Sequence, residues 1–490
     1  MTAVLVFDIG TSKIKAGLYS ENGEKLGEST RGTELIFPKN GWAEQDPNHW
    51  ISVMNDMANK LLKIDNVEAI GITGQMIGLV PVNRNLDPIE NAIIWLDSRA
   101  NNEAEQILEK ISLMDFLEIT GGIPSGKDVV SKILWLKINR QNIFDKAAYF
   151  LDVKDFLIAK ITNKIVTDIS TASVRGLVDI RKKDYSEDIL EIIGITKEKL
   201  PEIVNAKEIV GEGKDLFNGI PIVNGSGDAF VTPFGAGAVM DNKVHYYLGT
   251  SGWASTHTPE YLVNGERGIG SVLSVIPNRW LFISESESAG SCLDWFMENF
   301  GFSFDYNIID KYVQEAAPGS NKLLFLPWLY GERSPILDTY ARGGFINLSL
   351  SHSIREISRS IFEGIAMNTR WMLSGIMESG IQFKEVNAVG GGAKSDIWMQ
   401  ILSDITGFKI NKMEDPQNAT LKGIALISLL SLGKIKNYYE TENFVNVNKI
   451  FEPNTKNRGV YDELFENFKN IYESLKGIFE NLNGRGDLNE

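Results

Sequence analysis

Two segments of this chain end an apolar run with glycine followed by small hydroxyl side chains. The first is Asp8-Ile9-Gly10-Thr11-Ser12-Lys13, and the second, in the other half of the chain, is Leu248-Gly249-Thr250-Ser251-Gly252. Each predicts a β-hairpin whose tight turn points backbone amides and hydroxyl groups at an anion. A single turn of this kind is usually an ordinary one, but the repeated context indicates two related halves that bind one polyphosphate.

A carboxylate that could do proton chemistry follows the apolar strand predicted at 221–223. Asp228 comes at the end of Gly225-Ser226-Gly227-Asp228 and precedes a helix of small residues predicted over 230–239. It could simply cap that helix. It could also act as a general base for a substrate hydroxyl that attacks phosphorus. Asp8 could then hold Mg²⁺ together with phosphate oxygens, with Asp228 as a second candidate ligand.

A third glycine-rich turn follows the strand that ends at Val389. The run Gly390-Gly391-Gly392-Ala393-Lys394-Ser395 is not a Walker loop, because Ala393 stands where that loop requires glycine. It is either a plain tight connection or a place where an adenine or ribose can lie against the backbone.

Candidate sugar-binding residues lie at or just beyond the ends of two apolar strands, predicted at 69–73 and 92–95. Polar residues at strand ends mark the edge where α/β folds place ligands. Taken singly, each is more typical of a structural role, but together they offer the hydrogen-bonding groups and the aromatic face that a polyol needs. The set is Gln75, Met76, Trp95, Asp97 and Arg99.

Strand, turn and helix alternate along the whole chain, which predicts an α/β fold of two similar domains around a cleft. The expected domains are 1–241, which would bind the sugar and carries the first phosphate turn, and 242–480, which would bind ATP, followed by a polar, frayed tail at 481–490. Asn22-Gly23 predicts a hairpin turn. Helices are expected at 48–62, 102–111, 129–140, 153–161, 354–379, 395–406 and 420–432.

Composition excludes several classes of protein. The chain has 490 residues and a formal net charge of −15, which argues against nucleic acid and anionic membranes as partners. One cysteine and four scattered histidines argue against a disulfide framework or a zinc site. No basic leader and no apolar stretch long enough to span a bilayer is visible, so a cytoplasmic enzyme is expected. A homodimer is left open.

The motifs resemble those of the FGGY family of carbohydrate kinases over nearly the whole chain. The resemblance rests on both Gly-Thr-Ser turns, on Gly227-Asp228, on Gly41-Trp42-Ala43-Glu44-Gln45-Asp46-Pro47 and on the stretch from Leu326 to Phe345. Asn347 departs from the family pattern, and the segment 132–136 matches it only in part. The resemblance implies two ribonuclease H-like domains of the actin, hexokinase and heat-shock ATPase type. It also implies ATP and Mg²⁺ as cofactors and Asp228 as the general base, which would bind the sugar together with the residues at the strand ends. The implied ATP-binding residues are Gly10, Thr11, Ser12, Lys13, Gly249, Thr250, Ser251, Gly391, Gly392, Ala393 and Lys394.

Within the family, the segments around Gln75 and Asp97 look most like those of kinases that phosphorylate D-xylulose. Ile77 and Leu96 stand where that pattern has histidine and asparagine, so two hydrogen-bond donors are missing. D-Xylulose is therefore the leading acceptor, while other ketoses, pentitols, glycerol and sugar acids such as gluconate remain open. Two alternatives belong to other classes of protein. One is a catalytically silent regulator that binds sugar and ATP, and the other is an actin- or chaperone-like ATPase. The intact Asp228 and both phosphate turns disfavour the first, and the lack of an appended β-domain disfavours the second.

Overall fold

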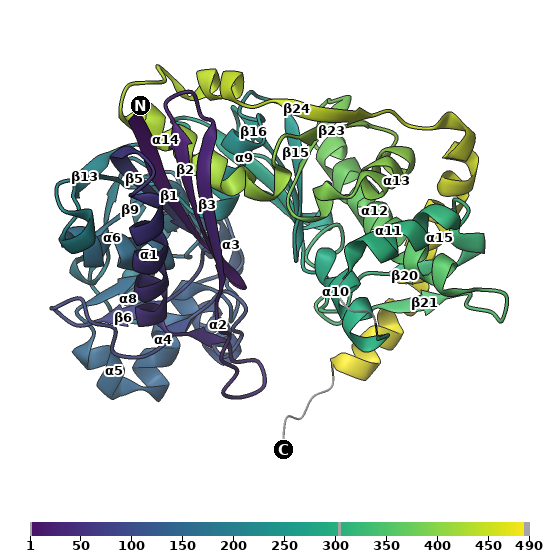
Figure 1. The fold of residues 1–490 in the computed structure, drawn as a ribbon. Coiled ribbons are helices and arrows are strands. Elements are labelled where there is room, and N and C mark those ends of the chain that lie inside the picture. Colours follow the sequence, from purple (N-terminus) through teal and green to yellow (C-terminus); the bar gives the residue numbers. More distant parts are fainter. Residues whose placement is uncertain (1, 302–304, 485–490) are drawn as a thin grey trace. The chain divides into compact units, whose positions relative to one another are not determined.

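A computed structural model describes residues 2–301 and 305–484 (Figure 1). The chain forms two compact units, and each contains segments that are distant in sequence. The first unit comprises the residues up to Gly235 together with Val272–Leu281 and Thr420–Phe444. The second comprises Ala236–Ser271, Phe282–Ala419 and the residues from Val445 onward. The segment Thr420–Phe444, near the C-terminal end of the chain, is thus part of the unit that contains the N-terminal strand.

The first unit is built on a six-stranded sheet with the order β13-β14-β5-β1-β2-β3. β1 runs antiparallel to β2 and parallel to β5, and β14 continues the parallel part beside β5. Residues 4–7 of β1 are fully buried, as expected for a central strand covered on both faces. The strands are β1 (Thr2–Ile9), β2 (Lys13–Ser20), β3 (Lys25–Gly32), β5 (Asn66–Gly74), β13 (Ile209–Glu212) and β14 (Pro221–Val223).

Helices of the first unit pack into two apolar clusters, one of which includes the inward residues of this sheet, and in Figure 1 α1 lies beside β1, β2 and β3. Asp46 caps α1 by accepting a hydrogen bond from the Asn48 amide, and Pro47 occupies the first turn. The helices are α1 (Pro47–Leu61), α2 (Asn101–Leu108), α3 (Leu113–Thr120), α4 (Val129–Asn139), α5 (Gln141–Lys146), α6 (Val153–Thr162), α7 (Ile169–Ser173), α8 (Glu187–Ile193), α9 (Asp228–Gly235) and α14 (Ala419–Ser431).

Short strand pairs of the first unit lie in the segments before and between these helices. They are β4 (Glu44–Gln45) with β7 (Ala92–Ile93), β6 (Val80–Val82) with β8 (Tyr149–Leu151), β9 (Val166–Asp168) with β12 (Glu202–Val204), and β10 (Val178–Asp179) with β11 (Asp184–Tyr185).

The second unit has an eight-stranded sheet with the order β17-β18-β19-β16-β15-β22-β23-β24. Its centre repeats the connectivity of the first unit. β15 runs antiparallel to β16 and parallel to β22, β23 continues parallel, and β24 ends the sheet antiparallel. Since β1 with β2, β5, β14 and β13 follow the same pattern, the prediction of two similar α/β domains is confirmed. The strands are β15 (Val244–Leu248), β16 (Gly252–Thr258), β17 (Val263–Asn264), β18 (Ile269–Leu273), β19 (Trp280–Ser286), β22 (Glu385–Val389), β23 (Lys409–Met413) and β24 (Val447–Phe451).

The large apolar core of the second unit lies between this sheet and a group of helices centred on α12, seventeen of whose residues are buried. Ser353 and Glu356 form a capping box at the start of α12. The helices are α10 (Gly290–Asn299), α11 (Tyr306–Glu315), α12 (Ile354–Glu378), α13 (Asp396–Thr406) and α15 (Arg458–Asn483), and a separate pair of strands is β20 (Leu324–Leu326) with β21 (Gly344–Ile346).

Three sequence expectations need correction. The strand expected at 92–95 ends at Ile93 and pairs with β4 outside the main sheet, because the chain turns at Ile94 to bury Asp97. The helix expected over 230–239 is α9, which begins at Asp228 and ends at Gly235. The frayed tail expected at 481–490 is wrong for its first residues, since α15 continues to Asn483; residues 485–490 lie outside the described residues.

Candidate active site

The first of the two predicted phosphate turns joins β1 to β2 in the first unit. The Gly10 amide donates to the Lys13 carbonyl over 3.0 Å, and a Cβ on Gly10 would lie 2.8 Å from that oxygen, so the turn requires glycine. Ser12 and Lys13 are exposed, whereas Thr11 is half-buried. Asp8 is buried at the end of β1, and this burial raises the pKa of its carboxyl despite the opposing charge of Lys15.

Thr11 belongs to a closed hydrogen-bond network with two of the candidate sugar-binding residues. Its hydroxyl donates to Gln75 Oε1 over 3.1 Å and accepts from the Trp95 indole over 2.8 Å. Gln75 Nε2 donates to Gln45 Oε1 over 2.6 Å, and Gln45 Nε2 returns to the Thr11 carbonyl over 2.8 Å. The phosphate turn and the predicted sugar pocket therefore form one connected structure.

Gln45 is a member of this network that the sequence did not single out. It is fully buried, and its Nε2 also donates to Thr33 Oγ1. It lies in the segment 41–47, which carries the family resemblance, so a signal was present. By itself, however, the motif does not indicate which partners Gln45 has in the fold.

Asp97 and Arg99 form an ion pair inside the first unit. Arg99 Nε and Nη2 donate to the Asp97 carboxylate at 2.7–3.0 Å, and Asp97 also accepts from the Ala43 amide. The Arg99 guanidinium lies 3.7 Å from the centre of the Trp42 ring and also pairs with Glu44. The side chains of Asp97 and Arg99 are 0% and 3% exposed. Both residues thus fix the 95–99 turn to the 41–45 segment, and direct contact with a sugar remains a prediction for them.

The loop that carries Asp228 is held by a second buried network. Ser226 Oγ donates to Asp168 over 2.7 Å, and the Gly227 amide donates to Thr171 Oγ1 over 3.0 Å. Lys154 pairs with Asp155 and Asp168; although burial alone would lower the pKa of Lys154, the two carboxylates raise it above its ordinary value. This network gives Asp228 a defined position at the start of α9, where its Oδ1 accepts from the Ala229 amide.

Met76 connects the predicted sugar pocket to Asp228. A Cβ placed on Gly227 would lie 2.2 Å from Met76 Cγ and 2.3 Å from its sulfur, so Met76 rests directly on the Gly227 backbone. Asp228, which follows, is half-buried. Gln75, Met76 and Asp228 are therefore neighbours within one unit.

In the second unit, the other phosphate turn meets the glycine-rich turn. Gly249 accepts from the Gly290 amide at the start of α10 over 2.8 Å, and Thr250 and Ser251 lie at the surface of the turn. Gly390 (φ +95°) and Gly392 pack on Leu248, directly before Gly249. Gly391 is different, since nothing lies within 4 Å of the place a Cβ would occupy. A flat group can thus reach the Gly391 backbone, while Ala393 is buried and Lys394 is exposed.

The residues present fit ATP and Mg²⁺ to different degrees. The open backbone at Gly391 and the hydroxyl-lined Gly249–Ser251 turn suit a nucleotide. No group of three or more His, Cys, Asp or Glu side chains that could hold a metal occurs among residues 2–301 and 305–484. Mg²⁺ typically takes one or two carboxylates and completes its shell with phosphate oxygens and water, and Asp8 and Asp228 stay the predicted carboxylates for it.

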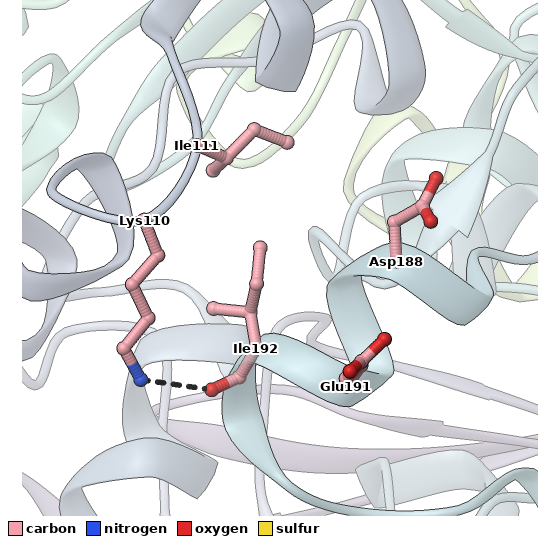
Figure 2. A pocket seen from close by; sticks show the side chains of 5 residues that line it. All are labelled: Lys110, Ile111, Asp188, Glu191 and Ile192. Carbon is pink, nitrogen blue, oxygen red and sulfur yellow. Dashed lines mark hydrogen bonds between the residues drawn. The ribbon is translucent and has the colours of Figure 1, made fainter.

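A separate hollow of about 420 Å³ on the first unit contains none of the predicted site residues (Figure 2). There the Lys110 ammonium donates to the Ile192 carbonyl over 3.2 Å, and the side chains of Asp188 and Glu191 lie on the far side of Ile192 from Lys110. Nothing in it matches the chemistry of the sequence motifs.

Two family models match this chain along most of its length. The model described as the FGGY family of carbohydrate kinases, N-terminal domain, matches residues 3–235, and the model of the C-terminal domain matches residues 244–432. The chain belongs to the FGGY family of carbohydrate kinases. It is therefore a phosphotransferase of the sugar-kinase type, and its two-domain fold is the one shared with actin and hexokinase, as the sequence predicted.

The relatives with curated names are mostly xylulose kinases. Xylulose kinase of Lactococcus lactis is 30% identical over 487 residues, which cover 96% of either chain. Gluconokinase of Bacillus subtilis is 27% identical over 456 residues and covers 89% of this chain and 88% of its own. The crystal structure of a ligand-bound xylulose kinase from Lactobacillus acidophilus superposes with a TM-score of 0.89 at 26% identity, covering 98% of this chain and all of the other. No helix in the described part of the chain is long and apolar enough to cross a membrane.

Proposed function

We propose that this FGGY kinase transfers the γ-phosphoryl group of ATP to a terminal hydroxyl of D-xylulose, giving D-xylulose 5-phosphate. The observation that carries the proposal is the contact of Met76 with Gly227. Through this contact the predicted acceptor pocket, with Gln75, adjoins the predicted general base, Asp228. A sugar held on Gln75 and Met76 would have a hydroxyl near that carboxylate.

The proposed chemistry needs one proton transfer and one displacement at phosphorus. The acceptor oxygen forms a bond to the γ-phosphorus as the bond to the ADP oxygen breaks, and the hydroxyl proton passes to Asp228. The amides and hydroxyls of the Gly10–Ser12 and Gly249–Ser251 turns would donate to the phosphate oxygens. Asp8 would hold Mg²⁺ together with phosphate oxygens, and the ion would neutralise charge that develops on them.

The choice of D-xylulose rests on the segments around Gln75 and Asp97 and on the names of the relatives. Xylulose kinases dominate those relatives at 25–30% identity over nearly the full chain. Gluconate is the second candidate, because a gluconokinase is 27% identical and because Ile77 removes a donor expected for xylulose. A pocket with isoleucine in place of a hydrogen-bond donor has a different order of preference among hydroxylated acceptors than a pocket with the donor.

The test is an ADP-release assay with Mg·ATP against D-xylulose, D-ribulose, L-ribulose, L-xylulose, D-fructose, glycerol, xylitol, erythritol and gluconate. We expect the highest kcat/KM on D-xylulose. Preferred turnover of another acceptor would reject D-xylulose and show that Ile77 and Leu96 redirect specificity. Silence with every acceptor, with ATP binding intact, would favour the regulator.

Asp228→Ala and Asp228→Asn test the assignment of the base. We expect either change to lower kcat by about 10²–10⁴-fold, the usual contribution of a general base, with a smaller change in the KM of the acceptor. Thermal unfolding should be measured in parallel, because Asp228 also accepts the Ala229 amide at the start of α9. Full activity in both variants would remove the catalytic assignment.

A further inference from the structure

Ile77 adopts a backbone conformation that β-branched residues rarely tolerate. Its φ is +60°, and no other β-branched residue among 2–301 and 305–484 has a positive φ. A residue held in this way persists only where its surroundings over-determine the conformation, and such positions gather at ligand sites. Ile77 directly follows Gln75 and Met76 of the proposed acceptor pocket. Its side chain packs against an apolar cluster of the first unit and offers no hydrogen-bond donor.

Asp152 holds the amide side of this turn. Its carboxylate accepts from the Ile77 amide over 3.1 Å, from the Gly78 amide over 3.2 Å and from the Val153 amide over 2.7 Å. Asp152 is 1% exposed and is at the same time the N-cap of α6. The turn is thereby tied to the start of a buried helix.

Lys132 holds the carbonyl side. Its ammonium donates to the Ile77 carbonyl over 3.0 Å and to the Ile94 carbonyl over 2.9 Å, and the residue is fully buried in α4. Ile94 precedes Trp95, whose indole donates to Thr11. One buried cation therefore joins the turn of Gln75 and Met76 to the turn of Trp95. Burial lowers the pKa of Lys132 to about 7, which the charges of Asp97, Asp128 and Asp152 oppose and Arg99 assists.

We propose that Lys132 and Asp152 are positioning residues that hold Ile77 in its left-handed conformation and so fix Gln75 and Met76 for the acceptor sugar. The inference rests on the proposed function and deepens it, because it names what sets the shape of the acceptor pocket. Neither residue touches the reacting atoms. They would act on sugar binding only through the position of the Ile77 turn. Met76, in the same turn, contacts the backbone of Gly227, so the position of the turn also bears on the loop of Asp228.

A double-mutant cycle of Lys132→Met and Ile77→Gly separates positioning from general stability. Glycine adopts positive φ freely, so with glycine at position 77 the turn keeps its left-handed conformation with less help from the Lys132 ammonium. We expect Lys132→Met alone to raise the KM of the best acceptor by about tenfold, in the range expected when a hydrogen bond to a charged group is lost. In the Ile77→Gly background, Lys132→Met should raise the KM of the acceptor by less than about threefold, a non-additivity typical of residues in contact. The KM of Mg·ATP should stay within about twofold throughout.

Leu86→Gly is the matched control. Leu86 also has a positive φ, of 64°, and lies in the 83–87 turn, which contains no proposed site residue. Glycine there removes the same kind of strain, so it should leave the acceptor KM and its response to Lys132→Met unchanged. If Lys132→Met does not fold, Asp152→Asn replaces it in the cycle, since asparagine loses the acceptor for the Ile77 amide but keeps an oxygen for Gly78 and Val153.

The outcomes separate the inference from the proposed function. An additive cycle, with the same rise in acceptor KM in both backgrounds, overturns the inference. So does a rise in the KM of Mg·ATP equal to that of the acceptor, because it would indicate general loosening. A wild-type protein that phosphorylates none of the acceptors rejects the proposed function instead.

Discussion

Gln45→Met is the sharpest test of the network that joins the first predicted phosphate turn to the proposed acceptor pocket. Methionine has nearly the length of glutamine and fills the same buried space, so the change removes hydrogen bonds and leaves little cavity. Three bonds are lost: from Nε2 to the Thr11 carbonyl at 2.8 Å, from Nε2 to Thr33 Oγ1 at 3.2 Å, and from Gln75 Nε2 to Oε1 at 2.6 Å.

The magnitude follows from which partners stay buried. Gln75 is 3% exposed, so its amide nitrogen would lose a partner that water cannot readily replace, at about 1–3 kcal/mol. Thr11 and Thr33 are half-buried and can turn partly to water, so they add about 1 kcal/mol together. We expect the free energy of unfolding to fall by about 2–4 kcal/mol. Because Gln75 loses its orientation, we expect the KM of the acceptor to rise by about tenfold.

The assay combines urea unfolding with steady-state kinetics for acceptor and for Mg·ATP. Thr33→Val is the control, because it removes only the longest of the three bonds and should cost less than about 1 kcal/mol without a change in acceptor KM. In the double variant Gln45→Met with Gln75→Met, the loss should be smaller than the sum of the single losses, since the two amides share one bond. An unchanged acceptor KM in Gln45→Met, at reduced stability, would refute the claim that this network orients Gln75.

Two further predictions concern the second unit. Glu332 is buried, and burial raises the pKa of its carboxyl to about 8 although the amides of Glu287 and Arg333 and the side chain of Asn368 oppose the shift. The folded state therefore holds the Glu332 proton more tightly than the unfolded chain does. The contribution of Glu332 to the free energy of unfolding is full below about pH 4.5 and falls by about 1.4 kcal/mol per pH unit up to pH 8. Glu332→Gln should flatten the pH dependence of the free energy of unfolding in that window, and an unchanged slope would contradict this. At the glycine-rich turn, Gly391→Ala should fold normally yet raise the KM of Mg·ATP by about tenfold, because its Cβ would occupy open space that a nucleotide needs. Gly390→Ala should instead unfold more readily, because its φ is +95° and its Cβ would lie 2.5 Å from the Leu248 carbonyl; equal effects of the two alanines on ATP binding would speak against a nucleotide at Gly391.

The elements of both units could be predicted from the sequence because their signals are local. Asp46-Pro47 set the start of α1, and Asn22-Gly23 set the turn between β2 and β3, where Gly23 has a φ of +72°. The repeated Gly-Thr-Ser turns predicted two halves of the same connectivity, since a hairpin followed by a parallel neighbour is what each half contains. Such features depend on residues a few positions apart, and a single sequence displays them directly.

The roles of side chains in the site could not be predicted in the same way, because they depend on partners far along the chain. Asp97 and Arg99 have the residue types of sugar ligands, yet each lies within 3 Å of the other and contacts the 42–44 segment. A polar side chain at a strand end has two uses, to bind a ligand or to hold another loop, and only the distance to its partner distinguishes them.

The role of Lys132 also could not be predicted from the sequence, because its partners lie far along the chain. It stands among apolar residues in a helix, so the sequence offers no reason to connect it with Ile77, 55 positions away. Yet burying a lysine without partners is costly, and this one finds two carbonyls that belong to the two turns of the proposed acceptor pocket. We infer that these two hydrogen bonds hold the two turns in one conformation. On our proposal, residues that would never contact a sugar help to set the specificity of the acceptor pocket.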